Sequence, residues 1–438
     1  MSNSPEKADV LILGAGVAGL AAARRLAGPR RVIVVEGRDR IGGRILTHRP
    51  ANQPLPIDLG PEFVHGRPKE TLELLDEAKL VAYDLSFRHF ESAAGKPIEN
   101  NEAWEKVDEL LGRLSSVGKA DCSFKEFLDR HAADVDEETR QRAISYVEGF
   151  NAARYDRISV QSILASNKEE EVIEGHRQHR LVGGYDQLAA ALAAGVRAPS
   201  RIELNTTVRE IRWQRGSVEV HATSPDGPRV YRAKQAVITL PLGVLQLPAD
   251  APTGVRFVPE LPTRSMIQQQ LCMGQVIKLT LECRTAFWEE LGDRDLSFIH
   301  AINTPITVWW TTHPLRTKRL TGWIGGSRAE GRSCDRASLM RDAIASLSQT
   351  FHVPAEQIAD EILDVYVHDW EHDPFSRGAY SYVAAGGAAA PGLLAEPIDD
   401  TLFFAGEHTH TGLIGTVAGA IKSGYRAADR TLLAGGQL

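Results

Sequence analysis

The sequence predicts an α/β protein built on a Rossmann-like βαβ unit that binds a dinucleotide. A short apolar run, Val10–Leu13, is typical of a central parallel strand that is covered on both faces. The turn after it has the spacing G-x-G-x-x-G, formed by Gly14, Gly16 and Gly19, and leads into a helix of small residues. A second apolar strand follows the helix and ends in Glu36. Together these observations place a dinucleotide site at the first strand-to-helix turn.

Each part of this motif has an expected role. One glycine permits the tight turn, one lets the backbone approach a pyrophosphate, and one lets the helix pack closely on the sheet. The free N–H groups and the positive dipole end of the helix favour an anion. Glu36 lies near the offset of about 20 residues at which a carboxylate accepts a hydrogen bond from a ribose hydroxyl. The alternative is a structural glycine turn with Glu36 as a capping residue.

The composition describes a globular chain and excludes several function classes. A length of 438 residues predicts about two to three domains, and 43% apolar residues are sufficient for large cores. Fifty basic and 57 acidic residues give a net charge of −7, which offers no electrostatic reason to bind nucleic acid or an anionic membrane. The four cysteines lack metal-ligand spacing. Without a leader or a long apolar run, we expect a cytoplasmic protein with no metal, membrane or nucleic-acid partner.

A glycine doublet between two arginines follows the second strand. Gly42 and Gly43 allow close backbone approach, and Arg38 and Arg44 can offer guanidinium groups to ribose or phosphate. The doublet favours FAD over NAD. With the strand, the glycine turn and Glu36, the pattern R-x-R-x-G-G-R resembles the flavin amine oxidases, which include monoamine oxidases, polyamine oxidases and histone lysine demethylases. The resemblance covers most of the chain.

The resemblance implies two interleaved domains. One is a Rossmann-like FAD-binding domain, and the other is an α+β substrate-binding domain with a mixed sheet and helices. The FAD-binding domain is expected at residues 1–82, 188–266 and 374–438. The substrate-binding domain is expected at residues 83–187 and 267–373.

The stretch IDLGPEFVHG, residues 57–66, resembles the family loop that runs beside the flavin ring. The match assigns Gly60 and Glu62 to cofactor binding. His65 matches the position that faces the substrate amine in the polyamine oxidases. The alternative for His65 is a surface histidine, or one that is bonded to backbone.

The middle of the chain contributes a predicted helical layer and fewer site residues. Apolar positions at three- and four-residue intervals predict helices from about Leu85 to Ser166. The acidic residues among 168–171 and Glu174 either steer a cationic amine or form a solvated face. In a strand at residues 202–211, Val208 matches the family valine whose backbone contacts the adenine side.

A lysine stands in the middle of an apolar strand, residues 274–282. Strand alternation places Lys278 on the same face as Val276 and Thr280. One interpretation is a half-exposed sheet with a polar second face. The other is that Lys278 matches the lysine that, in most of the family, reaches flavin N5 through a bound water. A buried ammonium is costly to desolvate and is suited to proton handling or oxygen activation.

The segment 368–386 resembles the family stretch that follows the substrate-domain sheet. Trp370 is assigned to cofactor binding. Tyr380 matches one wall of the aromatic cage that guides the amine nitrogen toward the flavin, and aromatic faces attract cations. Monoamine oxidases have a cysteine bonded to FAD just before this tyrosine. Because Ala379 stands here, we predict non-covalent FAD.

The C-terminal stretch, residues 402–428, completes the predicted cofactor site. A strand leads to the turn with Gly406 and Glu407, and Glu407 resembles the acid that contacts the ribityl-pyrophosphate region. A helix is expected from Thr416, with Val417 in its first turn, and its N–H groups should face the N1/C2 carbonyl edge of the flavin. Thr416 stands where many members have the second cage tyrosine. The exchange leaves room for a secondary or bulkier amine.

The resemblance implies FAD-dependent oxidation of an amine C–N bond to an imine, which water hydrolyses to an aldehyde plus an amine or ammonia. O2 is expected to reoxidise the flavin and give H2O2. The partners are therefore a small-molecule amine and O2, and a homodimer is one expected assembly. The predicted catalytic residues are Lys278, Tyr380, Thr416 and His65.

Three other functions stay open from the sequence. An L-amino-acid oxidase would need an arginine for the substrate carboxylate, and Arg88 and Arg180 are the candidates. A flavin dehydrogenase or desaturase would pass electrons to another acceptor. A flavin-binding protein without turnover would have no need of Lys278.

Overall fold

A five-stranded parallel sheet lies at the centre of one half of the molecule. The computed structural model describes residues 5–51, 53–85, 88–93, 96–291, 295–301 and 303–436. The strand order of this sheet is β11-β3-β2-β15-β24. In that order the strands are Arg201–Glu203, Val32–Val35, Val10–Leu13, Gln235–Ile238 and Leu402–Phe404. Every residue of β2, β3, β15 and β24 is buried, as the apolar run predicts for a strand that is covered on both faces.

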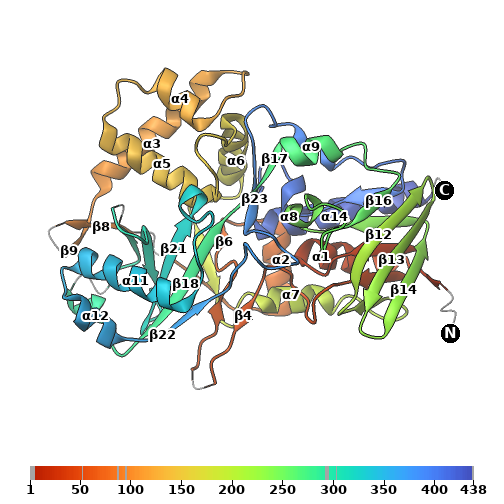
Figure 1. Cartoon of the computed structure of the whole chain (residues 1–438), viewed down its shortest axis with the longest axis horizontal. Coiled ribbons are helices and arrows are strands. Elements are labelled where there is room, and N and C mark those ends of the chain that lie inside the picture. The colour runs from red at the N-terminus through yellow and green to blue at the C-terminus, as the bar shows by residue number, and fades with distance from the viewer. Residues whose placement is uncertain are drawn as a thin grey trace.

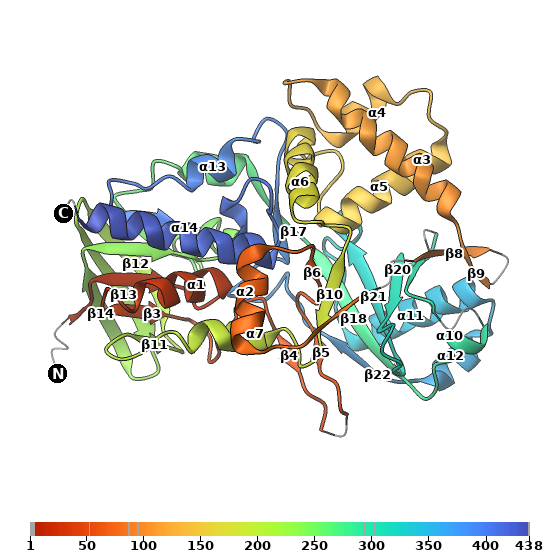
Figure 2. The same cartoon turned by 180° about the vertical axis from the view of Figure 1, so that it is seen from behind.

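Helices cover one face of this sheet and a second sheet covers the other. The helices, seen together in Figure 2, are α1 (Val17–Leu26), α2 (Lys69–Ala78), α7 (Asp186–Ala193) and α14 (Val417–Gly435). The covering sheet has the order β1-β14-β13-β12-β16. Its strands are Glu6–Lys7, Gly227–Ala233, Ser217–Ser224, Thr207–Gln214 and Arg256–Val258. Alternate residues of the central strands pack into the two cores.

The other half of the molecule contains a seven-stranded mixed sheet with the order β22-β18-β21-β20-β19-β8-β9 (Figure 1). Its strands are Ile362–Val367, Val276–Cys283, Arg319–Gly325, Val308–Thr311, Phe298–His300, His89–Ala93 and Lys96–Glu99. Helices α10 (Trp288–Leu291), α11 (Arg336–Phe351) and α12 (Ala355–Glu361) form its buried core together with the strands. This half is the predicted α+β domain, so the predicted fold class is confirmed.

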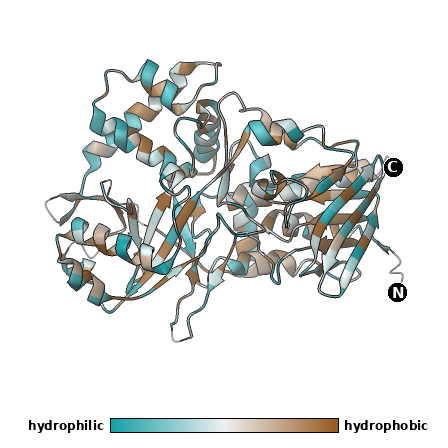
Figure 3. Cartoon of the chain, in the orientation of Figure 1, coloured by the Kyte–Doolittle hydropathy of each residue, from teal (hydrophilic) through white to brown (hydrophobic). Residues whose placement is uncertain are grey.

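A helical layer lies above the seven-stranded sheet in Figure 1 and has a core of its own. It consists of α3 (Asn101–Gly112), α4 (Phe124–His131), α5 (Glu137–Asn151) and α6 (Val160–Val172). Hydrophobic and hydrophilic positions alternate along these helices (Figure 3), as the three- and four-residue spacing predicts. Each helix begins where a side chain accepts a hydrogen bond from the first turn, and these caps are Asn100, Ser123, Asp136 and Ser159.

The helical layer starts later than the sequence predicts. The stretch expected to be helical from Leu85 instead contributes β8 and β9, which pair at the edge of the seven-stranded sheet. The prediction was therefore wrong for residues 89–93 and 96–99. Short edge strands such as these have little periodicity, and the pairing of β8 with β19, about 200 residues away in sequence, decides their structure.

Three small sheets, three short α-helices and three 3-10 helices complete the described fold, the last being η1 (Arg113–Val117), η2 (Gly326–Arg328) and η3 (Glu407–Thr409). The sheets are β6-β10-β7 (Val64–His65, Gln178–Leu181, Ala82–Asp84), β17-β23 (Leu271–Gly274, Tyr380–Val383) and β4-β5 (Thr47–His48, Ile57–Asp58). The helices are α8 (Leu242–Leu245), α9 (Arg264–Gln269) and α13 (Ala390–Leu394). The residue boundaries of the two domains stay a proposal. Among the described residues, no helix combines the length and the apolar character that crossing a membrane requires.

Candidate functional site

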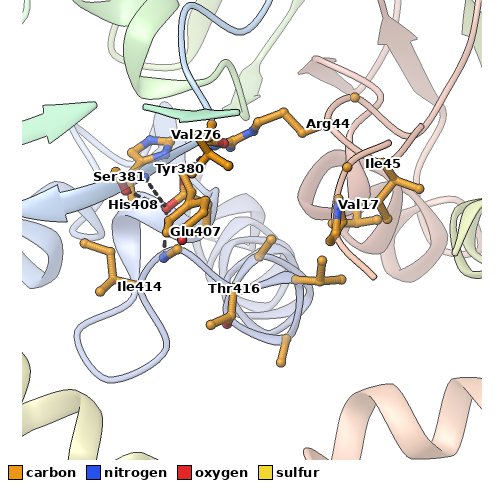
Figure 4. A pocket seen from close by; sticks show the side chains of 18 of the residues that line it. Val17, Arg44, Ile45, Val276, Tyr380, Ser381, Glu407, His408, Ile414 and Thr416 are labelled. Atoms are coloured by element: carbon orange, nitrogen blue, oxygen red, sulfur yellow. Dashed lines mark hydrogen bonds and ion pairs between the residues drawn. The ribbon is translucent and has the colours of Figure 1, made fainter. Parts of the chain in front are cut away.

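One cavity of about 770 Å³ runs from the glycine turn at the start of α1 to an aromatic wall beside the helical layer. Every site residue that the sequence predicts lines it, except Gly19. Those residues are Gly14, Gly16, Glu36, Arg38, Gly43, Arg44, Gly60, Glu62, His65, Val208, Lys278, Trp370, Tyr380, Gly406, Glu407, Thr416 and Val417. Figure 4 shows Tyr380, Ser381 and Glu407 on one side of it, with Val17 and Ile45 on the other.

The three glycines of the first turn have the geometry that a bound pyrophosphate requires. Gly14 has a φ of +112°, which a residue with a side chain rarely adopts. A Cβ atom on Gly16 would meet no atom within 4 Å, so this position leaves open space at the cavity. A Cβ atom on Gly19 would lie 2.0 Å from the Gly14 carbonyl oxygen, so the helix can pack this closely only on glycine. The turn therefore fits the phosphates of a dinucleotide.

Glu36 is buried at the end of β3 and faces the same turn. Its carboxylate accepts hydrogen bonds from the backbone N–H groups of Ala15, at 2.7 Å, and Arg38, at 2.9 Å. Burial raises the pKa of Glu36, and these two bonds oppose that rise. The carboxylate is thus held beside the glycine turn, at the place from which a ribose hydroxyl could be bound.

The two arginines around the glycine doublet already have carboxylate partners. Arg38 forms two hydrogen bonds with Asp373, at 2.8 and 2.6 Å. Arg44 pairs with Glu407 at 2.7 Å and donates to the Ala379 carbonyl oxygen at 2.9 Å. Their guanidinium groups connect the first βαβ unit to the C-terminal part of the cavity wall. They are less free to bind ribose or phosphate than the sequence predicts.

Glu407 connects several parts of the C-terminal cavity wall through its carboxylate. Besides Arg44, it accepts hydrogen bonds from the Ser381 hydroxyl at 2.5 Å and from the Gly415 backbone N–H at 3.0 Å. Burial alone would raise the pKa of Glu407, but the positive charge of Arg44 and the hydrogen bonds from Ser381 and Arg44 leave it lowered. The ionised carboxylate fixes the loop that leads into α14.

Thr416 is the N-cap of α14. Its hydroxyl accepts a hydrogen bond from the Gly419 backbone N–H at 2.9 Å and donates to the Leu413 carbonyl oxygen at 2.8 Å. Val417 and Ala418, in the first turn, line the cavity, so the positive end of a 19-residue helix faces it. The Thr416 hydroxyl thus uses its donor on the loop before α14 and one acceptor lone pair on the first turn of the helix.

Tyr380 stands at the start of β23 with its ring packed on Gly415. A Cβ atom on Gly415 would lie 2.9 Å from that ring. The Tyr380 hydroxyl donates to the Phe150 carbonyl oxygen at 2.8 Å, which connects the ring to α5. Burial raises the pKa of Tyr380, so the phenol stays neutral.

His65, in β6, lies against aromatic rings. The centroid of its imidazole is 5.9 Å from that of Phe150 and 6.1 Å from that of Phe63, both in edge-on arrangements. Burial lowers the pKa of His65 to about 4, so the ring is neutral at physiological pH. Among the described residues, its ring nitrogens have no hydrogen-bond partner. His65 thus presents a neutral nitrogen to the cavity.

The rest of the aromatic wall is absent from the sequence predictions. Tyr146 and Phe150 stack on α5 with centroids 5.7 Å apart and planes 10° apart. Trp310, Trp323 and Phe298 from the seven-stranded sheet also line the cavity. The spacing of Tyr146 and Phe150, four residues apart on one helix, is the only local signal of this wall.

Lys278 is buried in β18 with its ammonium group fully engaged. Its Nζ donates to the carbonyl oxygens of Asp58, at 2.7 Å, and Gly60, at 3.0 Å, and lies 2.7 Å from a Glu62 carboxylate oxygen. The other Glu62 oxygen lies 2.7 Å from Arg180 Nε. The sequence assigns Glu62 to the cofactor, whereas its carboxylate contacts these two cations.

Of the acidic cluster at 168–171 and 174, Glu170 is the member that lines the cavity. Glu169 pairs with Lys422 at 2.7 Å, Glu171 is exposed, and Glu174 lies 3.5 Å from Arg177. The described residues provide no hydrogen-bond or ion-pair partner for Glu170. Burial raises its pKa. Glu170 is therefore a half-buried carboxylate that is available to a cationic ligand.

Known proteins resemble this chain in sequence and in fold. The family profile described as "Flavin containing amine oxidoreductase" matches residues 17–432. "Polyamine oxidase 4" of Oryza sativa subsp. japonica is 29% identical over 96% of this chain and 88% of its own length. "Lysine-specific histone demethylase 1 homolog 2" of Arabidopsis thaliana is 26% identical over 97% of this chain, which spans only 58% of that relative. Wild-type putrescine oxidase bound to putrescine shares the fold, with a TM-score of 0.81 at 21% identity over 98% of this chain and all of that one.

Proposed function

Because the chain belongs to the family of flavin-containing amine oxidoreductases, we propose that it oxidises the C–N bond of a small amine to an imine and passes the electrons to O2, giving H2O2. Membership of the family makes it an amine-oxidising enzyme with FAD as its cofactor. Water then hydrolyses the imine to an aldehyde plus an amine or ammonia. Since Ala379 has no nucleophilic side chain, FAD is held without a covalent bond there.

The residues of the cavity fit FAD at both ends. The glycine turn with Glu36 would hold the pyrophosphate and ribose, and the N-terminus of α14 would face the ring. FAD, when bound, accepts the electron pair from the substrate. The chain itself has to bind the amine, orient the carbon that is oxidised, keep the nitrogen neutral and exclude water.

The neutral aromatic wall is the observation that carries the proposal. Amine oxidation of this kind needs an uncharged nitrogen, and the neutral His65 ring can accept a hydrogen bond from the substrate amine. The faces of Tyr380 and Phe150 can hold either charge state, because a ring attracts a cation without requiring a counter-ion. Thr416, smaller than a tyrosine, leaves space for a secondary amine.

The charged groups of the cavity favour an amine over an amino acid. Arg88 pairs with Glu99 at 2.8 Å and does not line the cavity. Arg180, paired with Glu62, does not line it either. Arg142 does, but it is bonded to Glu91 at 2.9 and 3.0 Å.

Glu170 adds a reason to prefer substrates with a second positive charge. Its carboxylate lines the cavity and would pair with a distal ammonium group. A diamine or polyamine supplies such a group at the far end of an aliphatic chain. We propose this class as the substrate.

Anaerobic mixing tests the proposal directly. The purified holoenzyme is mixed with diamines, polyamines, monoamines and amino acids while the absorption band of oxidised flavin is followed. We expect bleaching by diamines or polyamines and recovery of the band when O2 is admitted. If no amine bleaches the band, the proposed function is wrong. Bleaching that O2 does not reverse would instead indicate a dehydrogenase with another acceptor.

A further inference from the structure

The contacts of Lys278 leave its ammonium group no free N–H. An ammonium has three donors. Two are taken by the carbonyl oxygens of Asp58 and Gly60, and the third faces the Glu62 carboxylate at 2.7 Å. The side chain is only 4% exposed, so water does not compete for these contacts. Lys278 is thereby attached to the loop that carries Gly60 along the cavity wall.

Glu62 binds two cations at once. Besides Lys278 it contacts Arg180 Nε at 2.7 Å, and the Trp310 indole N–H donates to it at 3.3 Å. Burial would raise the pKa of Glu62, but the charges of Arg180 and Lys278 hold it below its usual value. Because Lys278 is in β18, Arg180 in β10 and Trp310 in β20, the carboxylate fixes parts of two different sheets.

Among the described residues, Glu62 supplies the one carboxylate in direct contact with the Lys278 ammonium group, although the charge of Lys278 also lowers the pKa of the Asp58 carboxyl. Asp58 touches Lys278 only through its carbonyl oxygen. Its own carboxylate accepts hydrogen bonds from the Thr47 hydroxyl, at 2.5 Å, and the Tyr185 backbone N–H, at 3.0 Å, and burial raises its pKa to about 6. Tyr83, the remaining titratable group near the cluster, has a pKa raised by burial and is neutral.

We infer that Glu62 is a positioning residue that keeps Lys278 as a charged ammonium at a fixed place in the cavity wall. Lys278 then acts on the reaction through a constant positive charge and donates no proton. A fixed charge in a water-excluded wall can stabilise negative charge that develops on the cofactor or on O2. The inference rests on the proposed function and deepens the role of Lys278 within it.

The test compares Glu62→Gln with a matched control, Glu282→Gln. Glu282 belongs to β18, the strand of Lys278, and its side chain is 14% exposed, close to the value for Glu62. It lies 3.9 Å from Arg319 Nε but does not line the cavity. Two properties are measured between about pH 6 and 10, the range over which an unpaired buried lysine can lose its proton. They are the absorption spectrum of the oxidised holoenzyme and the rate at which O2 reoxidises enzyme that dithionite has reduced.

We expect the spectrum and the rate of the parent and of Glu282→Gln to be independent of pH. In Glu62→Gln, Lys278 loses its anionic partner, so the spectrum should change with pH. That spectral change should have a midpoint pH. Above this pH the rate of reoxidation by O2 should fall at least about tenfold, as expected when a preorganised charge is lost. Lys278→Met should be slow at every pH, and Glu62→Asp should restore the pH-independent behaviour.

Two outcomes would overturn the inference. In one, the parent itself shows an ionisation that Lys278→Met removes, so that Lys278 titrates during the reaction. In the other, Glu62→Gln is as independent of pH as the parent. If Glu62→Gln does not fold, the parent, Lys278→Met and Glu62→Asp still decide between a fixed charge and a titrating group. Neither measurement uses an amine, so failure of the proposed substrate class would be seen separately.

Discussion

Glu170 is the residue whose environment gives the clearest substrate prediction. We expect Glu170→Gln to raise KM for a diamine by about tenfold, which corresponds to about 1.4 kcal/mol of lost binding. The KM of a monoamine of similar chain length should not change, because it has no distal charge to lose. Steady-state H2O2 production measures both. Glu171→Gln, an exposed substitution on the neighbouring position, is the control.

The same carboxylate predicts a pH dependence. Since burial raises the pKa of Glu170, its negative charge, and with it the binding of a distal ammonium, is present at high pH and lost as the pH falls through the raised value. KM for the diamine should therefore rise on acidification in the parent and stay nearly constant in Glu170→Gln. If KM for the diamine changed neither on Glu170→Gln nor with pH, Glu170 would not bind the distal ammonium of the substrate.

Single residues were predictable from sequence where the chemistry belongs to one short motif. Gly14, Gly16 and Gly19 show three separate backbone requirements that can be deduced from their spacing alone. The partners of Glu62 could not be deduced, because they come from β10, β18 and β20, which no local pattern relates. Lys278 was correctly expected to be buried, but its fully engaged ammonium was not foreseen.

At the scale of elements, the N-cap of α14, Thr416, both stabilises the helix and lines the cavity. Thr416→Val keeps the shape of the side chain but removes the acceptor of the Gly419 N–H. We expect a loss of about 1 kcal/mol in the free energy of unfolding, the usual contribution of an N-cap. Because the hydroxyl already donates to Leu413 and accepts from Gly419, KM for the amine should change by less than about twofold. Denaturant unfolding and steady-state kinetics check the two values.

Thr411→Val provides the comparison, since Thr411 is exposed in the loop before α14 and does not line the cavity. It should leave both values unchanged. If Thr416→Val instead raised KM strongly with no change in stability, the Thr416 hydroxyl would be bound to substrate and not to the helix.

The elements also show why strands and helices differed in predictability. β2 and α14 have strong local patterns, a continuous apolar run and a small-residue turn before a long amphipathic helix. β8 and β9 were included in a stretch expected to be helical from its three- and four-residue apolar spacing, but they pair with each other and β8 pairs with the distant β19. The aromatic wall is of the same kind, since residues of α5 and β20 line one cavity only in the folded chain.

At the scale of the whole molecule, the cavity is lined by residues of the parallel sheet and its helices and by residues of the seven-stranded sheet. The residues predicted to hold the cofactor are spread over nearly the whole chain, from Gly14 to Thr416, although α1 and α14 pack directly against each other in one core. The cofactor would add further contacts between these elements and the rest of the cavity wall. A ligand that binds only the folded state stabilises it by mass action. FAD should therefore contribute strongly to the stability of the assembled protein.

We expect the midpoint of thermal unfolding to rise as FAD is added to apoprotein, and to approach that of the holoenzyme. Gly16→Val, which fills the open space at the first turn, should weaken this dependence, because the side chain occupies the place of the pyrophosphate. Acid precipitation of the holoenzyme should leave the yellow colour in the supernatant, since Ala379 offers no thiol to the flavin. Colour retained on the precipitated protein would show a covalent bond to FAD at another residue. A midpoint of thermal unfolding that does not change with FAD would show that the cofactor does not stabilise the folded chain.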